Sequence, residues 1–150
     1  MMKSLLNFRD IGGVPTAEGR MFMKGIVFRS AHPDNAHKND IHKLKNLGIT
    51  TIIDLRSPTE SRYRRKDIEG IKTESLPIDF EKQTRERLMP YFTKGNSRDI
   101  IADISNELYL EMLDAAIPVF RQLSEILVSC GGSPVLIHCQ AGKDRTGIMC

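Results

Sequence analysis

The sequence predicts an α/β fold, a three-layer sandwich in which helices flank a central, mainly parallel sheet. Apolar runs rich in β-branched residues predict strands at 25–30, 49–55 and 134–137. Apolar residues at three- to four-residue spacing predict helices at 40–47, 99–113 and 116–129. Strands that alternate with helices are typical of a parallel sheet with both faces covered.

Start and stop signals support the elements of the first half. Asn39 is a predicted N-cap for the helix at 40–47, and Gly48 ends that helix. Ser57, Pro58 and Glu60 form a capping-box pattern that predicts a further helix, which carries a basic cluster at 62–66. Residues 73–78 predict an edge strand that ends near Pro77.

The second half contains one irregular stretch and two predicted helices. Residues 80–96 are basic and broken by Pro90 and Gly95, which indicates a lid over a site or a long connection. Pro118 is predicted in the first turn of the helix at 116–129, because proline suits that position. Gly131 and Gly132 end this helix. We expect the apolar side chains of these helices to form core, with Tyr109, Met112 and Phe120 among them.

Length and composition bound the function. The 150 residues suit a single domain, 1–150, and the net charge of +3 is too small to indicate a nucleic-acid partner. Three cysteines are an odd number, which favours a reducing compartment over a disulfide framework. Neither an apolar run of about 18 residues nor a signal-peptide core is present, so we expect no integral membrane segment and a cytoplasmic location, with non-conventional export left open. Nothing in the sequence indicates the oligomeric state.

A cysteine and an arginine separated by five residues follow the strand at 134–137. Such a loop can turn its N–H groups inward as an anion cradle, and the Arg145 guanidinium can bind phosphate oxygens with two parallel N–H donors. The same positive field favours the thiolate of Cys139. Because arginine and amides supply the positive charge, we expect no metal and no cofactor. His32, His37 and His42 are spaced by five and do not share a helix face, so they predict no metal site.

Residues 138–147, HCQAGKDRTG, resemble the signature of the cysteine-dependent protein tyrosine phosphatase superfamily. The inner GKDR resembles a branch of bacterial tyrosine phosphatases with dual-specificity and lipid-phosphatase character. The resemblance implies hydrolysis of phosphate monoesters on proteins through a cysteinyl-phosphate. It also implies that the pair Lys143-Asp144 goes with acceptance of phosphoinositides. Strings at 7–13 and 54–57 recur in this branch, where they look structural.

Roles for the loop follow from this chemistry. Cys139 is the expected nucleophile, and Thr146 is expected to donate its hydroxyl to the departing sulfur. His138 is expected to order the loop and to help lower the pKa of the thiol. The expected phosphate-binding set runs through the loop: Gln140, Ala141, Gly142, Lys143, Asp144, Arg145 and Thr146.

The proton for the leaving oxygen has two candidate donors. Asp79 is the first, because it follows a predicted strand beside the possible lid. It also matches, with a one-residue offset, an acid that follows Leu-Pro in the resembling family. Asp144, inside the loop, is the second. The resembling fold continues with further helices beyond this loop, so we expect the 150 residues to be the N-terminal portion of a longer domain.

Three other classes of protein share features of this loop. A P-loop nucleotide binder is excluded, because Asp144 follows Gly142-Lys143 and Ile137 occupies the place of the first glycine. A sulfurtransferase also carries a loop cysteine, and a phosphatase-like fold can bind phosphorylated ligands without turnover. The sequence leaves these last two open.

Overall fold

The computed structural model describes residues 2–62, 67–79 and 98–150. Within these ranges five strands form one sheet in the order β1-β2-β5-β3-β4. The pair β1 and β2 is antiparallel, and every other neighbouring pair is parallel. The elements are β1 (Arg9–Asp10), β2 (Val27–Ser30), α1 (Lys38–Asn46), β3 (Thr51–Asp54), β4 (Lys72–Ser75), α3 (Arg98–Ser129), β5 (Val135–His138) and α4 (Asp144–Met149).

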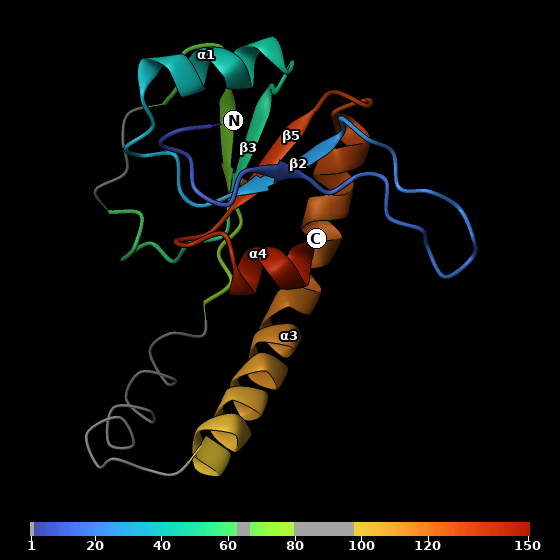
Figure 1. Ribbon diagram of the computed structural model, residues 1–150, viewed down its shortest axis with the longest axis vertical. Helices are drawn as coiled ribbons and strands as arrows, with labels where there is room; N and C mark the ends of the chain where they lie inside the picture. Colours follow the sequence, from blue (N-terminus) through green and yellow to red (C-terminus); the bar gives the residue numbers. More distant parts are fainter. Residues whose placement is uncertain (1, 63–66, 80–97) are drawn as a thin grey trace.

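Helices cover both faces of the sheet (Figure 1), which confirms the predicted three-layer sandwich. α1 lies over one face, and α3 and α4 lie over the other. Successive strand residues point to opposite faces, and the two cores follow this alternation. Ile52 and Leu136 pack in the cluster under α1, whereas Ile53 and Ile137 pack in the cluster under α3.

The centre of the sheet is β5, which pairs with β2 on one side and β3 on the other. All four β5 residues are buried, as are all four β3 residues. Parallel strands bring their carboxyl ends to one edge of the sheet, and such edges are where α/β folds bind ligands. The segment after β5 therefore emerges at the predicted site, next to the residues that follow β2 and β3.

Helix α1 begins two residues before the predicted start at residue 40. Its N-cap is His37, without a side-chain cap, so the expected cap at Asn39 was wrong. The Ser4 hydroxyl accepts the His37 N–H (2.8 Å) instead, and it donates to the Asp40 carboxylate (2.7 Å). A distant segment of the chain thus caps this helix, which a local pattern could not reveal.

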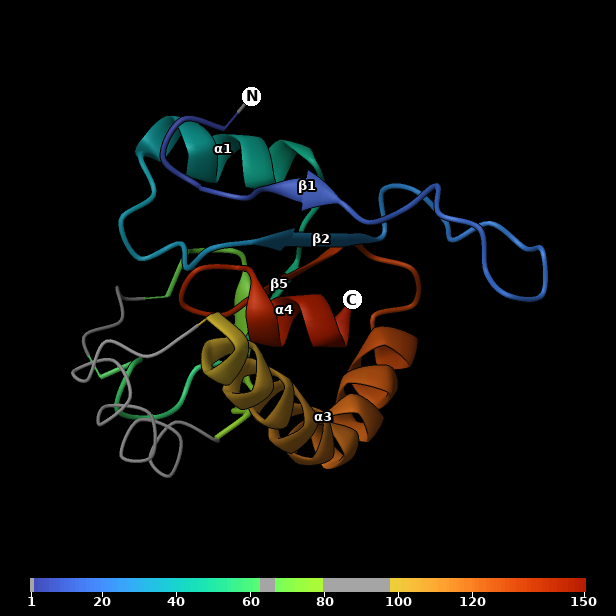
Figure 2. The same ribbon diagram turned by 60° about the horizontal axis from the view of Figure 1, so that its bottom comes forward.

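The two helices predicted after residue 98 are one continuous helix, α3. Pro118 lies inside it rather than in a first turn, where its missing N–H leaves the Asp114 carbonyl without the usual donor. Figure 2 shows that α3 bends along its length, and an interior proline is a recognised cause of such a bend. The expected core roles were right for Met112, which is buried, and wrong for Tyr109 and Phe120, which are 45% and 54% exposed.

The capping box predicted at Ser57 is present. The Ser57 N–H donates to Glu60 Oε2 (2.9 Å), and the Glu60 N–H donates to Ser57 Oγ (3.4 Å). The helix predicted to start here was wrong for the described residues, because 58–62 form turns and a bend. The basic cluster at 62–66 lies mostly outside the described residues, as does the stretch at 80–96. β4 is the edge strand, as predicted. No helix in the described ranges is long and apolar enough to cross a membrane.

Candidate active site

The loop between β5 and α4 turns four consecutive carbonyl groups outward. Each accepts a hydrogen bond from a group outside the loop, which fixes the orientation of the peptide units. The donors are the His32 N–H to Gln140 O (3.3 Å), Asn7 Nδ2 to Ala141 O (2.8 Å), and Arg29 Nη2 to Gly142 O and Lys143 O (both 3.0 Å). When the carbonyl oxygens face outward, peptide N–H groups can face inward, as an anion cradle requires.

Gly142 lets this loop lie against the end of β2. Its φ of +68° lies in the left-handed region, which disfavours a side chain. A β-carbon at this position would meet the Ser30 carbonyl oxygen at 2.2 Å and the Ala31 nitrogen at 2.5 Å. Glycine is therefore the residue that allows this loop path.

The Cys139 thiol lies at the floor of the loop and is only 3% exposed. Burial by itself raises the pKa of Cys139. The Thr146 hydroxyl, the N–H groups of Thr146 and Gly142 and the Arg145 charge outweigh burial, so the pKa of the thiol is lowered. In the described part of the chain, the buried Thr146 Oγ1 has no other hydrogen-bond partner, which suits a hydroxyl directed at the sulfur.

Arg145 lies on the same side as the thiol and is fixed by Glu60. Its Nη1 and Nη2 each donate to one Glu60 oxygen at 2.6 Å, and Nη1 also lies 3.4 Å from the Leu55 carbonyl. Arg145 as a whole is 6% exposed. A guanidinium presents its donors in one rigid plane, so a carboxylate that binds one edge sets the direction of the others. Glu60 thus orients the arginine that faces the cradle.

We expect Glu60→Gln to destabilise the protein by about 1–3 kcal/mol at pH 7, because it replaces two charge-assisted hydrogen bonds by weaker ones. Burial raises the pKa of Glu60, but Arg145 and Ser57 outweigh burial and lower it below 4.5. A lowered carboxyl pKa stabilises the folded state above the unfolded pKa, and this stabilisation is lost as pH falls. The difference between wild type and variant in the free energy of unfolding, measured in urea, should therefore become smaller as the pH falls below 4.5.

Glu18→Gln is the matched control for this measurement. Glu18 also pairs with an arginine, Arg20, but the two side chains are 73% and 79% exposed. Exposed pairs contribute roughly 0–1 kcal/mol, so this variant should unfold like wild type. Equal stability of Glu60→Gln and wild type at pH 7 would contradict the anchoring role of Glu60.

A buried ionic network supports the site at the ends of β3 and β5. Arg56 is 1% exposed and bridges Asp54 (Nη2 to Oδ2, 2.9 Å) and Asp34 (Nη1 to Oδ2, 2.6 Å). Burial alone lowers the pKa of Arg56, but the two carboxylates outweigh it and raise the pKa. Residues 54–57 thus belong to a buried network that supports the site, which agrees with the structural role that the resemblance implied.

His138 lies beside this network, 3.8 Å from Asp54 Oδ1, and its Nδ1 is 3.1 Å from the Cys139 carbonyl oxygen. Burial is the largest influence on His138 and lowers its pKa, so the imidazole is neutral at pH 7. A neutral ring adds no positive charge to the thiol. Its contact with the Cys139 carbonyl can help to hold the start of the loop in place.

The two candidate acids both lie at this edge of the sheet. Asp79 is exposed and follows Ile78, whose N–H donates to the Leu55 carbonyl (3.1 Å), the same carbonyl that Arg145 approaches. Asp144 is also exposed and begins α4, and its Oδ1 accepts a hydrogen bond from the Tyr109 hydroxyl (2.5 Å). The fold thus brings both carboxylates to the ends of the strands around the loop.

Sequence reasoning missed four residues that hold the loop: Asn7, Arg29, Glu60 and Tyr109. Glu60 was recognised only as a helix cap, and that capping box was the available signal, because it placed a carboxylate just after β3. Asn7 adopts a φ of +56°, a conformation that asparagine tolerates better than most residues. In the described ranges no group of histidine, cysteine, aspartate and glutamate side chains could hold a metal ion.

A cysteine and an arginine on one phosphate loop, at the carboxyl edge of a mainly parallel sheet, are the architecture of protein tyrosine phosphatases. The chain belongs to the tyrosine phosphatase family, whose model matches residues 1–150. The resemblance drawn from the loop is therefore confirmed over the full length.

Three curated relatives are similar to this chain. A putative tyrosine-protein phosphatase of Cupriavidus necator is 28% identical over 96% of this chain and 52% of its own length. The inositol diphosphatase DSP2 of Arabidopsis thaliana is 30% identical over 93% and 56%. The triple specificity protein phosphatase PtpB of Mycobacterium tuberculosis is 29% identical over 95% and 58%. The chain thus spans just over half the length of these relatives.

Proposed function

We propose that the protein is a cysteine-dependent phosphate monoester hydrolase that acts on phosphotyrosine and other phosphorylated side chains of proteins, and on phosphoinositides. One observation carries the proposal. The buried thiol of Cys139, whose pKa is lowered, and the buried side chain of Arg145 lie on one loop, and the carbonyl groups of that loop point outward. Relatives named for tyrosine, triple-specificity and inositol substrates support this range.

The first step transfers the phosphoryl group to sulfur. The Cys139 thiolate attacks phosphorus, the P–S bond forms and the P–O bond to the leaving group breaks. Arg145 and the N–H groups of residues 140–146, Lys143 and Asp144 among them, hold the phosphoryl oxygens as charge redistributes. Asp79 protonates the leaving oxygen. Water then attacks the phosphocysteine, an aspartate takes its proton, and Thr146 donates to the departing sulfur.

Phosphate release from 4-nitrophenyl phosphate, measured beside thiocyanate formation from thiosulfate, tests this function. We expect phosphate and no thiocyanate. Thiocyanate formation would make the protein a sulfurtransferase. Binding of a phosphorylated ligand without phosphate release would make it a binding module. A panel of phosphotyrosine peptides, phosphoserine peptides and phosphoinositides then ranks the substrates.

The location follows from the nucleophile. Cys130, Cys139 and Cys150 are free thiols, and a thiolate nucleophile functions only while reduced. A reducing compartment therefore suits the reaction, and we place the protein in the cytoplasm.

The acid role of Asp79 predicts a dependence on the leaving group. Asp79→Asn should lower kcat by about 10²-fold or more for phosphotyrosine, because its leaving oxygen needs a proton. The loss should be much smaller for 4-nitrophenyl phosphate, whose leaving group is stable as an anion. Glu69→Gln, which removes another exposed carboxylate before β4, is the matched control and should retain wild-type rates. Equal losses for both substrates would remove Asp79 from this role.

A further inference from the structure

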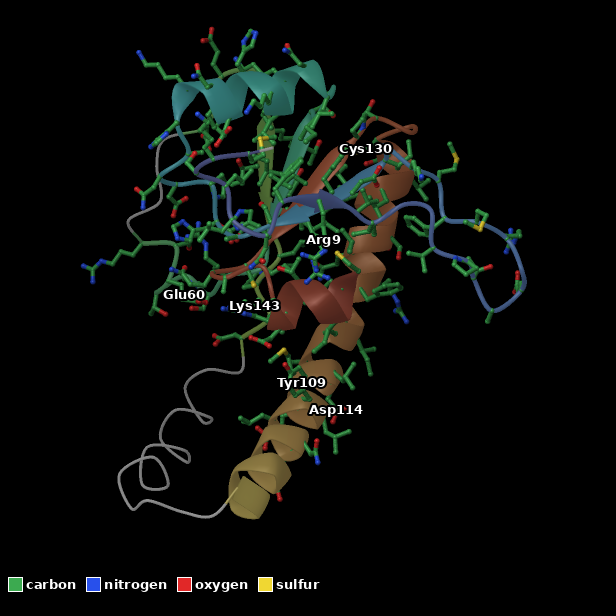
Figure 3. The ribbon with its side chains drawn as sticks, in the orientation of Figure 1. Arg9, Glu60, Tyr109, Asp114, Cys130 and Lys143 are labelled. Atoms are coloured by element: carbon green, nitrogen blue, oxygen red, sulfur yellow. The ribbon has the colours of Figure 1, made fainter. Side chains whose placement is uncertain are left out.

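A hydrogen bond joins α3 to the phosphate loop. The Tyr109 hydroxyl donates to Asp144 Oδ1 over 2.5 Å, although the residues are 35 positions apart. Tyr109 lies on the stretch of α3 that passes α4 and the loop (Figure 3). Its side chain is 45% exposed, so the hydroxyl is not buried in the core, and Asp144 is the partner that the geometry gives it.

The Tyr109 hydroxyl is the donor in this hydrogen bond, and the Asp144 carboxylate is the acceptor. The hydrogen bond to Asp144 is the main influence on Tyr109, followed by the Asp144 charge and by burial, and all three raise the pKa of the phenol. The phenol therefore stays protonated at neutral pH and acts as the donor. Asp144 accepts this hydrogen bond through Oδ1. Hydrolysis of a phosphocysteine needs a group that takes a proton from the attacking water, and a carboxylate can do so.

We propose that Tyr109 is a positioning residue, which holds the Asp144 carboxylate at the phosphate loop as the base for hydrolysis of the phosphocysteine. This inference rests on the proposed function and deepens it, since it assigns the second proton transfer to Asp144 and leaves the first to Asp79. Water oxygen attacks phosphorus and its proton passes to Asp144. The P–S bond breaks with its electron pair on sulfur, which regenerates the Cys139 thiolate and releases inorganic phosphate.

The geometry favours two separate carboxylates for the two steps. Asp79 reaches the edge of the sheet through the segment after β4, beyond β3. Asp144 is part of the loop itself and is tied to α3, on the helical layer that also holds α4. A carboxylate that a helix residue holds by a hydrogen bond keeps one orientation at the loop, which suits the second proton transfer.

Rapid-mixing kinetics of Tyr109→Phe with 4-nitrophenyl phosphate test the proposal on the full protein. The variant keeps the ring and loses only the hydroxyl. We expect the first turnover to release nitrophenol at the wild-type rate, followed by a steady state about fivefold slower, the equivalent of one lost hydrogen bond. Phosphoenzyme should accumulate. Leu110→Ala, which truncates the next residue on α3, 63% exposed, is the matched control and should behave like wild type.

A variant that combines Tyr109→Phe with Asp144→Asn tests whether Tyr109 acts through Asp144. Asp144→Asn keeps the shape of the side chain and removes the base, so it should slow the steady state more than Tyr109→Phe and leave the first turnover unchanged. Adding Tyr109→Phe to Asp144→Asn should then cost less than twofold, because coupled residues are not additive. If Tyr109→Phe fails to fold, Asp144→Asn alone still tests the proposal, because a steady state equal to that of wild type would show that Asp144 is not the base.

Three results would overturn the inference. These are an unchanged steady state in Tyr109→Phe, a first turnover slowed as much as the steady state, or independent effects of the two substitutions. Failure of the proposed function has a different signature, since wild-type protein would then release no nitrophenol at all.

Discussion

Replacing Cys139 by serine is expected to abolish turnover while ligand binding persists. A serine hydroxyl at this position keeps its proton at neutral pH, so the loop retains its donors and loses its nucleophile. We expect kcat for 4-nitrophenyl phosphate to fall by about 10³-fold or more. A phosphotyrosine peptide should still bind in calorimetry, because Arg145 and the loop amides are intact.

A control and a second readout support this measurement. Cys130→Ser removes the thiol at the far end of α3, outside the loop, and should retain wild-type kcat. The rate at which iodoacetamide inactivates wild type should be half-maximal at a pH below about 8.5, the ordinary pKa of a thiol. The reason is that the pKa of Cys139 is lowered. Hydrolysis by Cys139→Ser within tenfold of wild type would mean that the nucleophile lies elsewhere.

Gly142→Ala is expected to disrupt the loop. A methyl group there would overlap the backbone of Ser30 and Ala31 and would adopt a left-handed φ. Backbone at the end of a central strand cannot move aside as a flexible side chain can. Strain and overlap together should cost about 2–6 kcal/mol of stability. Any folded fraction should have lost most of its activity, because the carbonyls held by Arg29 and Asn7 would shift.

Gly131→Ala separates overlap from backbone strain. Gly131 has a similar φ of +58°, but a β-carbon there would meet no atom within 4 Å. It should cost about 1 kcal/mol, the price of the left-handed conformation alone, and leave kcat unchanged. Thermal unfolding and 4-nitrophenyl phosphate turnover of both variants provide the comparison. Similar losses in the two variants would show that close packing against β2 is not what requires glycine at position 142.

Much of the fold could be predicted from local patterns. The strands at β2, β3 and β5 were predicted because continuous β-branched runs mark strands that are buried on both faces. The long helix was misread as two, because proline is common in a first turn and the local sequence cannot tell that position from an interior bend. Tyr109 and Phe120 were assigned to the core because helical spacing shows that residues share a face, but not what covers that face.

By itself, the sequence determined the loop chemistry of this protein: a thiol and a guanidinium with five residues between them, after a buried strand. That spacing is local, and a short loop can satisfy it without help from the rest of the chain. Only the tertiary structure decided which residues hold the loop in place. Glu60 meets Arg145 across 85 positions, and Asn7 meets Ala141 across 134. Such pairs arise from the order in which strands join the sheet, and no pattern along the chain records that order.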